Sequence, residues 1–289
     1  MKVNKDKLNA FKYIKGRKIM DRELLANGNI KNKKLSPRDE LITNWVSVLF
    51  DENTYQCFLE FLLSIADEKY KEFSNKLIPQ VNNILGIRLP YLQRIAKQIA
   101  KGDYKGFLSY RNIQYFEEIM VRGYVIGNIS NQSIEEIKEM IHHHVLKLDN
   151  WSTCDSFCSS LKIAKKYPNE IFELILPYAN SKECYEIRFF IVMCLNYYIE
   201  DEHISLVDEV LQSISSEEYY VNMAICWAYT VIFQYDSNRV YQYLKKLKQE
   251  LEIEQNCRKR FLLRKTISKI CDSRKITEEE KAIVRSYHV

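Results

Sequence analysis

The chain has 289 residues, 46% of them hydrophobic, which supplies enough apolar material for a substantial core. Its net charge of +5, from 43 cationic and 38 acidic residues, permits nucleic-acid binding without requiring it. Seven glycines and five prolines are too few for a sheet protein with many turns, so helices joined by short loops are favoured.

Cysteines and apolar runs indicate a reducing, aqueous environment. The eight cysteines lack the close spacing of a small disulfide-bonded domain, and Cys154 and Cys158, which share a helical face, are predicted to be core thiols. The longest apolar run, residues 189–195, is too short to span a bilayer, and the amino terminus lacks an apolar signal core. A cytoplasmic protein without membrane association is expected.

Residues 1–50 differ in composition from the rest of the chain. They are rich in lysine and asparagine, their apolar positions are sparse, and residues 36–39 (Ser-Pro-Arg-Asp) are typical of a helix start. We therefore predict an N-terminal extension over 1–50 with one or two short helices, followed by a single helical domain over 51–289.

Helical periodicity is sustained from Tyr55 onward. Phe58, Phe61, Leu62 and Ile65 form an apolar stripe. Further along the chain, helices are predicted over 115–126, 133–146, 154–167, 169–179, 188–199, 204–214, 217–233, 238–250, 255–273 and 277–288. Because the loops between them are short, the predicted fold is all-α, an α-solenoid of five or six helical hairpins.

Two polar clusters are predicted to be structural. The histidine triplet at 142–144 cannot chelate a metal together, because consecutive helical residues point about 100° apart, so a solvated helix end is expected. Glu117 and Glu118 precede Arg122 at helical spacing, which is typical of ion pairing on a helix surface. The chain has no glycine-rich phosphate loop, which argues against a nucleotide-driven enzyme.

A period of 37 to 39 residues links four side chains in the second half. Trp151, Arg188, Trp227 and Arg264 follow one another at intervals of 37, 39 and 37 residues. This is the length of a helical-hairpin repeat, so the same face of successive repeats is predicted to carry them. Asp155 lies four residues after Trp151 and therefore on the same helical face. These side chains together indicate a DNA-handling groove with one catalytic group.

Asp155 and Trp151 have two interpretations. A helix is expected to start near residues 150–152, where the helix dipole keeps a carboxylate ionised. An ionised Asp155 beside aromatic side chains is suited to stabilising positive charge that develops on a sugar. The alternative is a capping acid beside a core tryptophan.

The chain resembles the DNA alkylation repair family, the alkylpurine DNA glycosylases built from HEAT-like repeats (AlkD-like). Four segments carry the resemblance: residues 84–90 (Ile-Leu-Gly-Ile-Arg-Leu-Pro), 150–155 (Asn-Trp-Ser-Thr-Cys-Asp), 186–190 (Glu-Ile-Arg-Phe-Phe) and 224–227 (Ala-Ile-Cys-Trp). It extends from about residue 55 to the C terminus and implies a curved solenoid with a concave, DNA-facing groove.

The resemblance also implies a role for each matching residue. Asp155 takes the place of the catalytic aspartate, which stabilises an oxocarbenium-like sugar, while Trp151 and Trp227 pack on the deoxyribose. Arg188 takes the place of an arginine that holds the DNA backbone. The implied reaction is excision of cationic N3- or N7-alkylated purines from duplex DNA by a monomer, with neither a metal nor a nucleotide cofactor.

A basic cluster near the C terminus adds candidate DNA contacts. Its members are Arg258, Lys259, Arg260, Arg264, Lys265 and Lys269. Arg264 and Lys265 are the predicted DNA-binding residues among them, and a solvated helix face is the alternative.

Three departures from the family pattern leave rival functions open. Leu77 stands where active members have a tyrosine, in a stretch interrupted by Pro79, and Met223 and Thr230 stand where basic residues are expected. One rival is a non-catalytic relative that binds unusual DNA structures, and another is a protein-binding helical scaffold. DNA binding weakens steeply with salt, which separates the scaffold from the other two.

Overall fold

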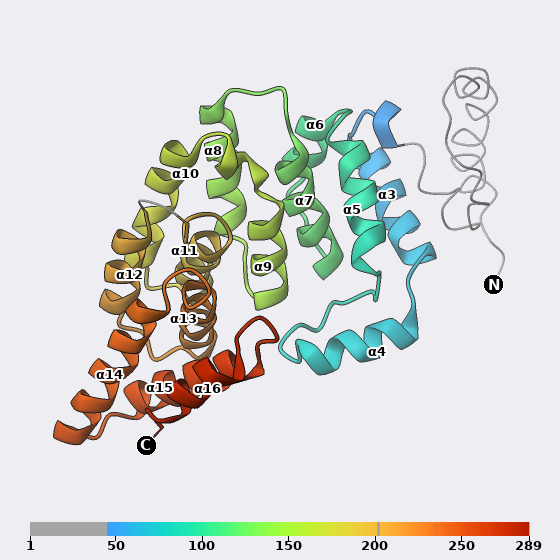
Figure 1. Cartoon of the computed structure of the whole chain (residues 1–289). Helices are drawn as coiled ribbons and strands as arrows, with labels where there is room; N and C mark the ends of the chain where they lie inside the picture. The colour runs from blue at the N-terminus through green and yellow to red at the C-terminus, as the bar shows by residue number, and fades with distance from the viewer. Residues whose placement is uncertain (1–44, 201–202, 289) are drawn as a thin grey trace, which may run out of the picture. The chain divides into compact units, whose positions relative to one another are not determined.

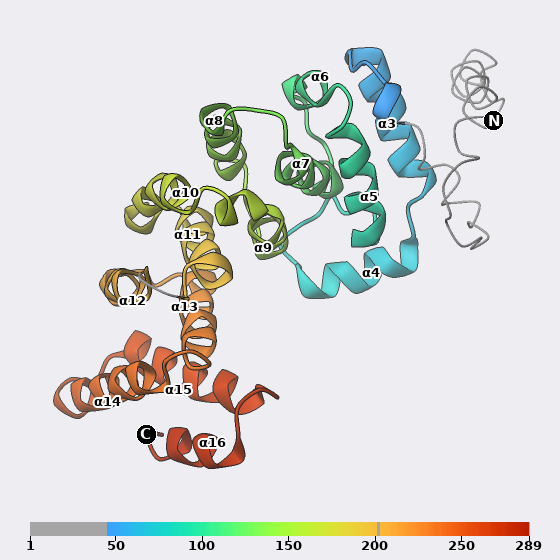
Figure 2. The ribbon, with the colours of Figure 1, turned by 45° about the horizontal axis from the view of Figure 1, so that its top comes forward.

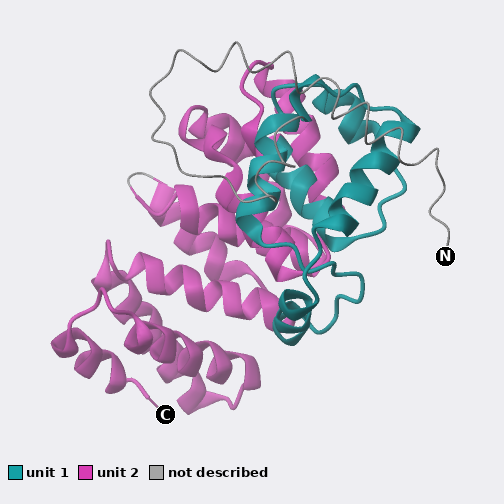
Figure 3. Ribbon diagram, turned by 90° about the vertical axis from the view of Figure 1, so that its right-hand side faces the viewer, with its two compact units in different colours: residues 1–125 teal, residues 126–289 magenta. Residues whose placement is uncertain are grey.

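A computed structural model of the chain describes residues 45–200 and 203–288 (Figure 1). Those residues fold into α-helices and short 3-10 helices with no strand, which confirms the all-α prediction. The chain divides into two compact units, residues 1–125 and 126–289 (Figure 3). No helix in the described ranges is both long and apolar enough for a membrane span.

The first unit is built around an aromatic core. Its elements are η2 (Trp45–Ser47), α3 (Glu52–Ser64), α4 (Glu68–Leu77), α5 (Leu89–Ile99), α6 (Tyr104–Ser109) and α7 (Phe116–Asn128), of which α7 runs past the unit boundary. Trp45 packs against Phe58 and Phe61 of α3, with ring centroids 5.4 and 5.3 Å apart. The predicted stripe on α3 is buried throughout. The helix start predicted at residues 36–39 lies outside the described residues.

The stretch that contains Leu77 and Pro79, residues 76–81, begins as a helix and leaves it before the proline. α4 continues as a regular helix to Leu77 and ends before Pro79, because proline disfavours helical geometry in the residue that precedes it. None of the ten residues of α4 is buried, and Leu77 itself is half exposed.

Glu117, Glu118 and Arg122 are buried, so the prediction of surface ion pairs was wrong. The Glu117 carboxylate accepts hydrogen bonds from the backbone amides of residues 85, 86 and 87 at 2.8–3.2 Å. Glu118 accepts one from the Tyr55 hydroxyl at 2.9 Å, and Arg122 donates to the carbonyls that end α6. Helical spacing is the same for a surface pair and for two buried groups that each serve the backbone, so spacing alone misled the prediction.

Glycine is required in the loop that Glu117 holds. Gly86 has a φ of +86°, a conformation that residues with a Cβ seldom adopt. A Cβ at this position would lie 2.4 Å from the carbonyl oxygen of Asp67. The loop over residues 84–88 is thereby packed against the start of α4.

The second unit is a series of helical hairpins. Its elements are α8 (Ile134–Val145), α9 (Trp151–Ser160), η3 (Lys162–Lys165), α10 (Pro168–Ile175), η4 (Leu176–Asn180), α11 (Cys184–Tyr197), α12 (Ile204–Ser213), α13 (Tyr219–Ile232), α14 (Ser237–Ile253), α15 (Cys257–Asp272) and α16 (Glu278–Arg285). α9, α11, α13 and α15 pack successively against one another and form a row, with α8, α10, α12 and α14 along one side of it (Figure 2). This sequential stacking is the arrangement of an α-solenoid.

α11 is the centre of this row. Residues 187–195 of α11 are all buried, because the helix contacts α9 on one side and α13 on the other. Burying an aliphatic or aromatic side chain contributes about 1.5–3 kcal/mol, so this stretch is a major part of the core. A helix that is apolar on nearly all sides is expected only in such a sandwiched position.

Local capping agrees with the sequence in most places and differs at the histidine triplet. Ser133 and Thr277 cap α8 and α16, and they are the first residues of the helices predicted over 133–146 and 277–288. His142 and His143 are exposed at the end of α8, but His144 is buried and packs edge-on against Phe157, with ring centroids 4.4 Å apart. The prediction of a solvated helix end therefore holds for His142 and His143 but not for His144, because His144 faces α9.

Candidate active site

The starts of the stacked helices set which residues meet. α9, α11, α13 and α15 begin at residues 151, 184, 219 and 257, so the intervals between helix starts are 33, 35 and 38 residues. Trp151, Arg188 and Trp227 are consequently the first, fifth and ninth residues of their helices. Because each lies four residues further along its own helix, the three residues occupy successive turns and not one level of the row.

Two thiols of α9 contact the backbone of α11. The Cys154 thiol points to the carbonyl oxygen of Tyr185 at 3.8 Å, and the Cys158 thiol to that of Phe189 at 3.7 Å. Both cysteines are buried and free, as predicted, and burial raises the pKa of Cys158 well above its ordinary value. Thiols are weak hydrogen-bond donors, and these two contacts lie at the level where α9 and α11 face each other.

This register brings Asp155 of α9 to Arg188 of α11. Each is the fifth residue of its helix. The guanidinium binds both carboxylate oxygens, Nε to Oδ1 at 2.9 Å and Nη2 to Oδ2 at 2.8 Å. Nη1 donates to the carbonyl oxygen of Tyr220, near the start of α13, at 2.6 Å. Arg188 therefore links three consecutive helices of the row and orients the carboxylate through a bidentate contact.

The two side chains of the ion pair, Arg188 and Asp155, differ in solvent exposure. The Arg188 side chain is 7% exposed, whereas that of Asp155 is 19% exposed. Burial alone would lower the pKa of Arg188, but the hydrogen bonds and the charge of Asp155 offset it and raise that pKa above its ordinary value. Arg188 is thus a permanent cation within the protein, and the carboxylate is the more accessible member of the pair.

The two tryptophans lie at different levels of the row. Trp151 is half-buried and is the first residue of α9, directly after Asn150, whose side chain caps the helix by accepting from the Thr153 amide at 3.0 Å. The helix start predicted at 150–152 is therefore confirmed. Trp227 is also half-buried, but it lies seven residues beyond Tyr220 on α13, which is roughly 10 Å along the helix axis.

Residues of the C-terminal basic cluster have different surroundings. Arg264 and Lys265, both on α15, are exposed. Arg258 instead donates to the carbonyl oxygens of Ser216 and Ile214 at 2.8 and 2.7 Å, and so holds the loop before α13. Separately, Lys259 forms an ion pair with Glu250 at 3.0 Å. Arg258 and Lys259 therefore bind other groups of the protein, whereas Arg264 and Lys265 are exposed to solvent.

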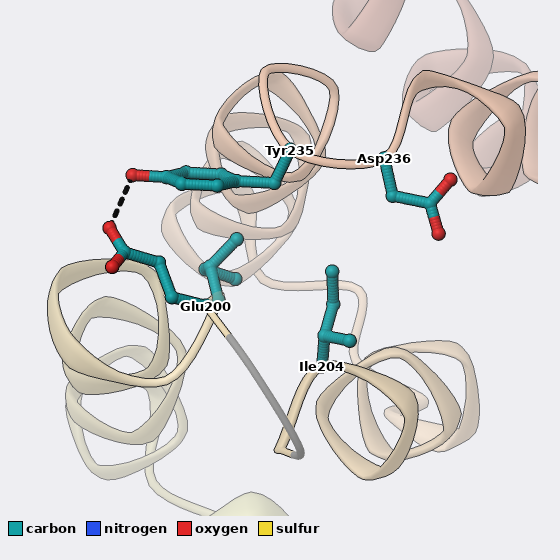
Figure 4. A pocket seen from close by; sticks show the side chains of 5 residues that line it. Glu200, Ile204, Tyr235 and Asp236 are labelled. Carbon is teal, nitrogen blue, oxygen red and sulfur yellow. Dashed lines mark hydrogen bonds between the residues drawn. The ribbon is translucent and has the colours of Figure 1, made fainter.

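In the described residues, no metal-binding cluster includes the candidate site residues, and one pocket lies apart from them. In the described part of the chain, no three His, Cys, Asp or Glu side chains gather closely enough to hold a metal ion. This open pocket has a volume of about 450 Å³ and is lined by residues that follow the ends of α11 and α13 (Figure 4). Tyr220 lies at the other end of α13, near its start. The lining residues of the pocket are Ile199, Glu200, Ile204, Tyr235 and Asp236, none of them a predicted site residue.

Comparison with known proteins identifies the family. The model of the family described as "DNA alkylation repair enzyme" matches residues 59–270, a span that includes Asp155, Arg188 and both tryptophans. The chain belongs to the DNA alkylation repair enzyme family. No curated protein and no solved structure matches it. Membership supports a role in DNA repair, with DNA as the partner.

Sequence reasoning missed residues that border the ion pair. Tyr220 receives Arg188 through its backbone carbonyl, which no side-chain motif encodes. Tyr185 and Tyr220 are each the second residue of their helices, and their rings lie 6.0 Å apart between centroids. Their 35-residue spacing equals the interval between the starts of α11 and α13. A search for tyrosines at that interval could therefore have identified this pair from the sequence.

Proposed function

We propose that the protein is a DNA glycosylase that excises cationic N3- or N7-alkylated purines from duplex DNA. Asp155 is the proposed catalytic residue, and the observation that carries this proposal is its partly exposed carboxylate, held through both oxygens by Arg188. Family membership supports DNA as the substrate.

The chemistry requires little besides a fixed negative charge. An alkylated purine is already a cationic leaving group, so no general acid is needed for its departure. As the N-glycosidic bond breaks, its electron pair leaves with the base and the deoxyribose develops oxocarbenium-like positive charge, which a preorganised carboxylate stabilises without reorganising. A water molecule then adds to C1′ and releases a proton to solvent, which completes the hydrolysis. In this proposal Asp155 supplies the charge, and Trp151 and Trp227 pack on the sugar.

Arg188 is proposed to position Asp155. Three of its five N–H donors already bind Asp155 and the Tyr220 carbonyl, and its side chain is nearly buried. Direct contact between Arg188 and a DNA phosphate would use the remaining donors. Contacts to phosphate are assigned instead to the exposed cations Arg264 and Lys265 on α15.

Release of free base from a duplex with one 7-methylguanine tests the proposal. Asp155→Asn removes the negative charge with little change in shape and is expected to slow base release by about 100-fold or more. Asp272→Asn makes the same chemical change at an exposed position on α15 and serves as the matched control. Wild-type release no faster than the spontaneous rate would contradict glycosylase activity on this lesion.

Binding of DNA without excision is the second candidate function. The Asp155–Arg188 pair favours it, because Arg188 neutralises within the protein much of the charge that catalysis needs. The leucine at position 77 points the same way, since active relatives have a tyrosine there. Salt-dependent binding of the duplex together with no base release would support this function.

A further inference from the structure

Four aromatic side chains form a row at the starts of α11, α13 and α15. The row consists of Tyr185, Tyr220, Tyr219 and Phe261, named in spatial order. Successive ring centroids lie 6.0, 5.3 and 5.8 Å apart. The row therefore continues across three consecutive helices of the second unit.

The row is accessible to a partner. Tyr219 is 54% exposed, and the other three residues are half-buried. The ring plane of Tyr219 is at 80° to that of Tyr220 and at 68° to that of Phe261, so the row offers both ring faces and ring edges. Exposed aromatic side chains of this kind favour flat, uncharged surfaces as partners.

The row is continuous with the candidate active site. Arg188 donates to the Tyr220 carbonyl oxygen at 2.6 Å, while its other donors hold Asp155. The Cys154 thiol, one residue before Asp155, points to the Tyr185 carbonyl oxygen at 3.8 Å. Two members of the row are thus attached through their backbones to the residues that orient the catalytic carboxylate.

Charges around the row select the chemistry of the partner. Exposed Glu183, Glu217 and Glu218 precede α11 and α13 and outnumber the exposed Lys182, which disfavours phosphate there. The row ends instead on α15, which carries Arg260 and Arg264. A fitting partner has uncharged flat groups over α11 and α13 and anionic groups toward α15, and a DNA strand has both.

We propose that this row is a packing surface for the deoxyribose faces of the DNA strand beside the nucleotide at Asp155, and for a base of that strand once it is out of the duplex stack. This inference rests on the proposed function in taking DNA as the ligand, but it concerns binding and not base release. Stacking of an unpaired base on an aromatic side chain contributes about 1–3 kcal/mol and depends little on sequence. Packing of an aromatic ring on a sugar is independent of sequence in the same way. The row then positions the strand, while Asp155 performs the chemistry.

The test compares Tyr219→Ala, Tyr219→Phe and Tyr235→Ala. Tyr219→Phe keeps the ring and removes the hydroxyl. Tyr235→Ala removes an equally exposed tyrosine, 55% against 54%, that follows the last turn of α13, whereas Tyr219 begins that helix. Circular dichroism and thermal melting establish that each variant is folded.

Binding is measured with a fluorescein-labelled duplex, either unmodified or carrying one 7-methylguanine, at several salt concentrations. Tyr219→Ala is expected to weaken binding of both by about tenfold or more, with the salt slope unchanged because no phosphate contact is lost. Tyr219→Phe and Tyr235→Ala are expected to stay within about twofold of wild type. Wild-type affinity in Tyr219→Ala, or an equal loss in Tyr219→Phe, overturns the packing surface.

The two proposals fail separately. If the wild type binds DNA through Tyr219 but releases no base, the result supports the packing surface and contradicts the glycosylase proposal. If base release depends on Asp155 while Tyr219→Ala binds DNA like the wild type, the result supports the glycosylase proposal and contradicts the packing surface. Absence of any salt-dependent DNA binding by the wild type overturns both.

Discussion

Each unit contains a carboxylate that is bound within the protein, and the two differ in exposure and in what satisfies the charge. In the first unit Glu117 is 1% exposed and accepts from three consecutive backbone amides. In the second unit the Asp155 side chain is 19% exposed and bound by Arg188. Glu117 has no surface left for a ligand, whereas Asp155 keeps one. The comparison separates an acid that maintains the fold from an acid available for chemistry.

The buried arginines of the two units differ in the same way. Burial lowers the pKa of Arg122, which donates to backbone carbonyls, and nearby Tyr55 and Glu118 only partly oppose that effect. For Arg188 the bound Asp155 outweighs burial and raises the pKa. Arg122 closes the end of α6, while Arg188 holds a carboxylate that solvent reaches.

The largest expected effect on stability is that of Glu117→Ala. It leaves buried backbone amides without an acceptor, so we expect the free energy of unfolding to fall by about 3–5 kcal/mol. Glu72→Ala removes an exposed glutamate from α4 and is the control. Urea denaturation measures both, and equal stability of the two variants would show that Glu117 is not structural.

Arg188→Ala is expected to have the next largest effect. Breaking a buried ion pair costs about 3–5 kcal/mol, and the partial exposure of Asp155 reduces this to roughly 2 kcal/mol. Arg188→Lys keeps the charge but loses the bidentate geometry, so an intermediate loss is expected. Thermal and urea melting measure both variants.

A double-mutant cycle between Asp155→Asn and Arg188→Ala sharpens the role of the arginine. If Arg188 acts only through Asp155, its removal slows base release in the wild type but adds nothing in the Asp155→Asn background. Multiplicative losses would instead indicate an independent contact between Arg188 and DNA. Single-turnover base release is the measurement, because it isolates the chemical step.

Substitutions in the basic cluster are expected to have the smallest effects, and these effects differ between Arg258 and Lys265. Arg258→Ala removes hydrogen bonds to the loop before α13 and is expected to cost about 1–2 kcal/mol of stability, with little change in the salt dependence of DNA binding. Lys265→Ala removes an exposed cation, so stability should be unchanged while the salt slope falls by about one unit. Fluorescence anisotropy at graded salt distinguishes them, and the reverse pattern would contradict the assignment.

Helix identity and capping followed from the sequence because they depend on local chemistry. The cap residues Ser133 and Thr277, the core thiols at 154 and 158, and the α9 start near Trp151 were all predictable from a few neighbouring residues. The burial of Glu117 and His144 was not, since a helix facing solvent and one facing a loop or a second helix have similar patterns.

The ion pair could not be predicted because it depends on register. A sequence interval of 37 residues relates Trp151 to Arg188, but the starts of α9 and α11 are 33 residues apart, and this aligns Asp155 with Arg188. The aromatic row depends on the same register. Repeat length thus predicted which helices carry the candidate residues, and the helix starts decided which of them touch.

The most direct test measures base release from a 7-methylguanine duplex at 25 °C for wild type, Asp155→Asn and Glu117→Gln, per folded molecule determined by circular dichroism. The account predicts that Asp155→Asn loses about 100-fold or more of the rate while remaining folded. Glu117→Gln is expected to melt at a lower temperature yet to release base at the wild-type rate. Wild-type activity in Asp155→Asn would contradict the account, because Asp155 would then not be the catalytic carboxylate.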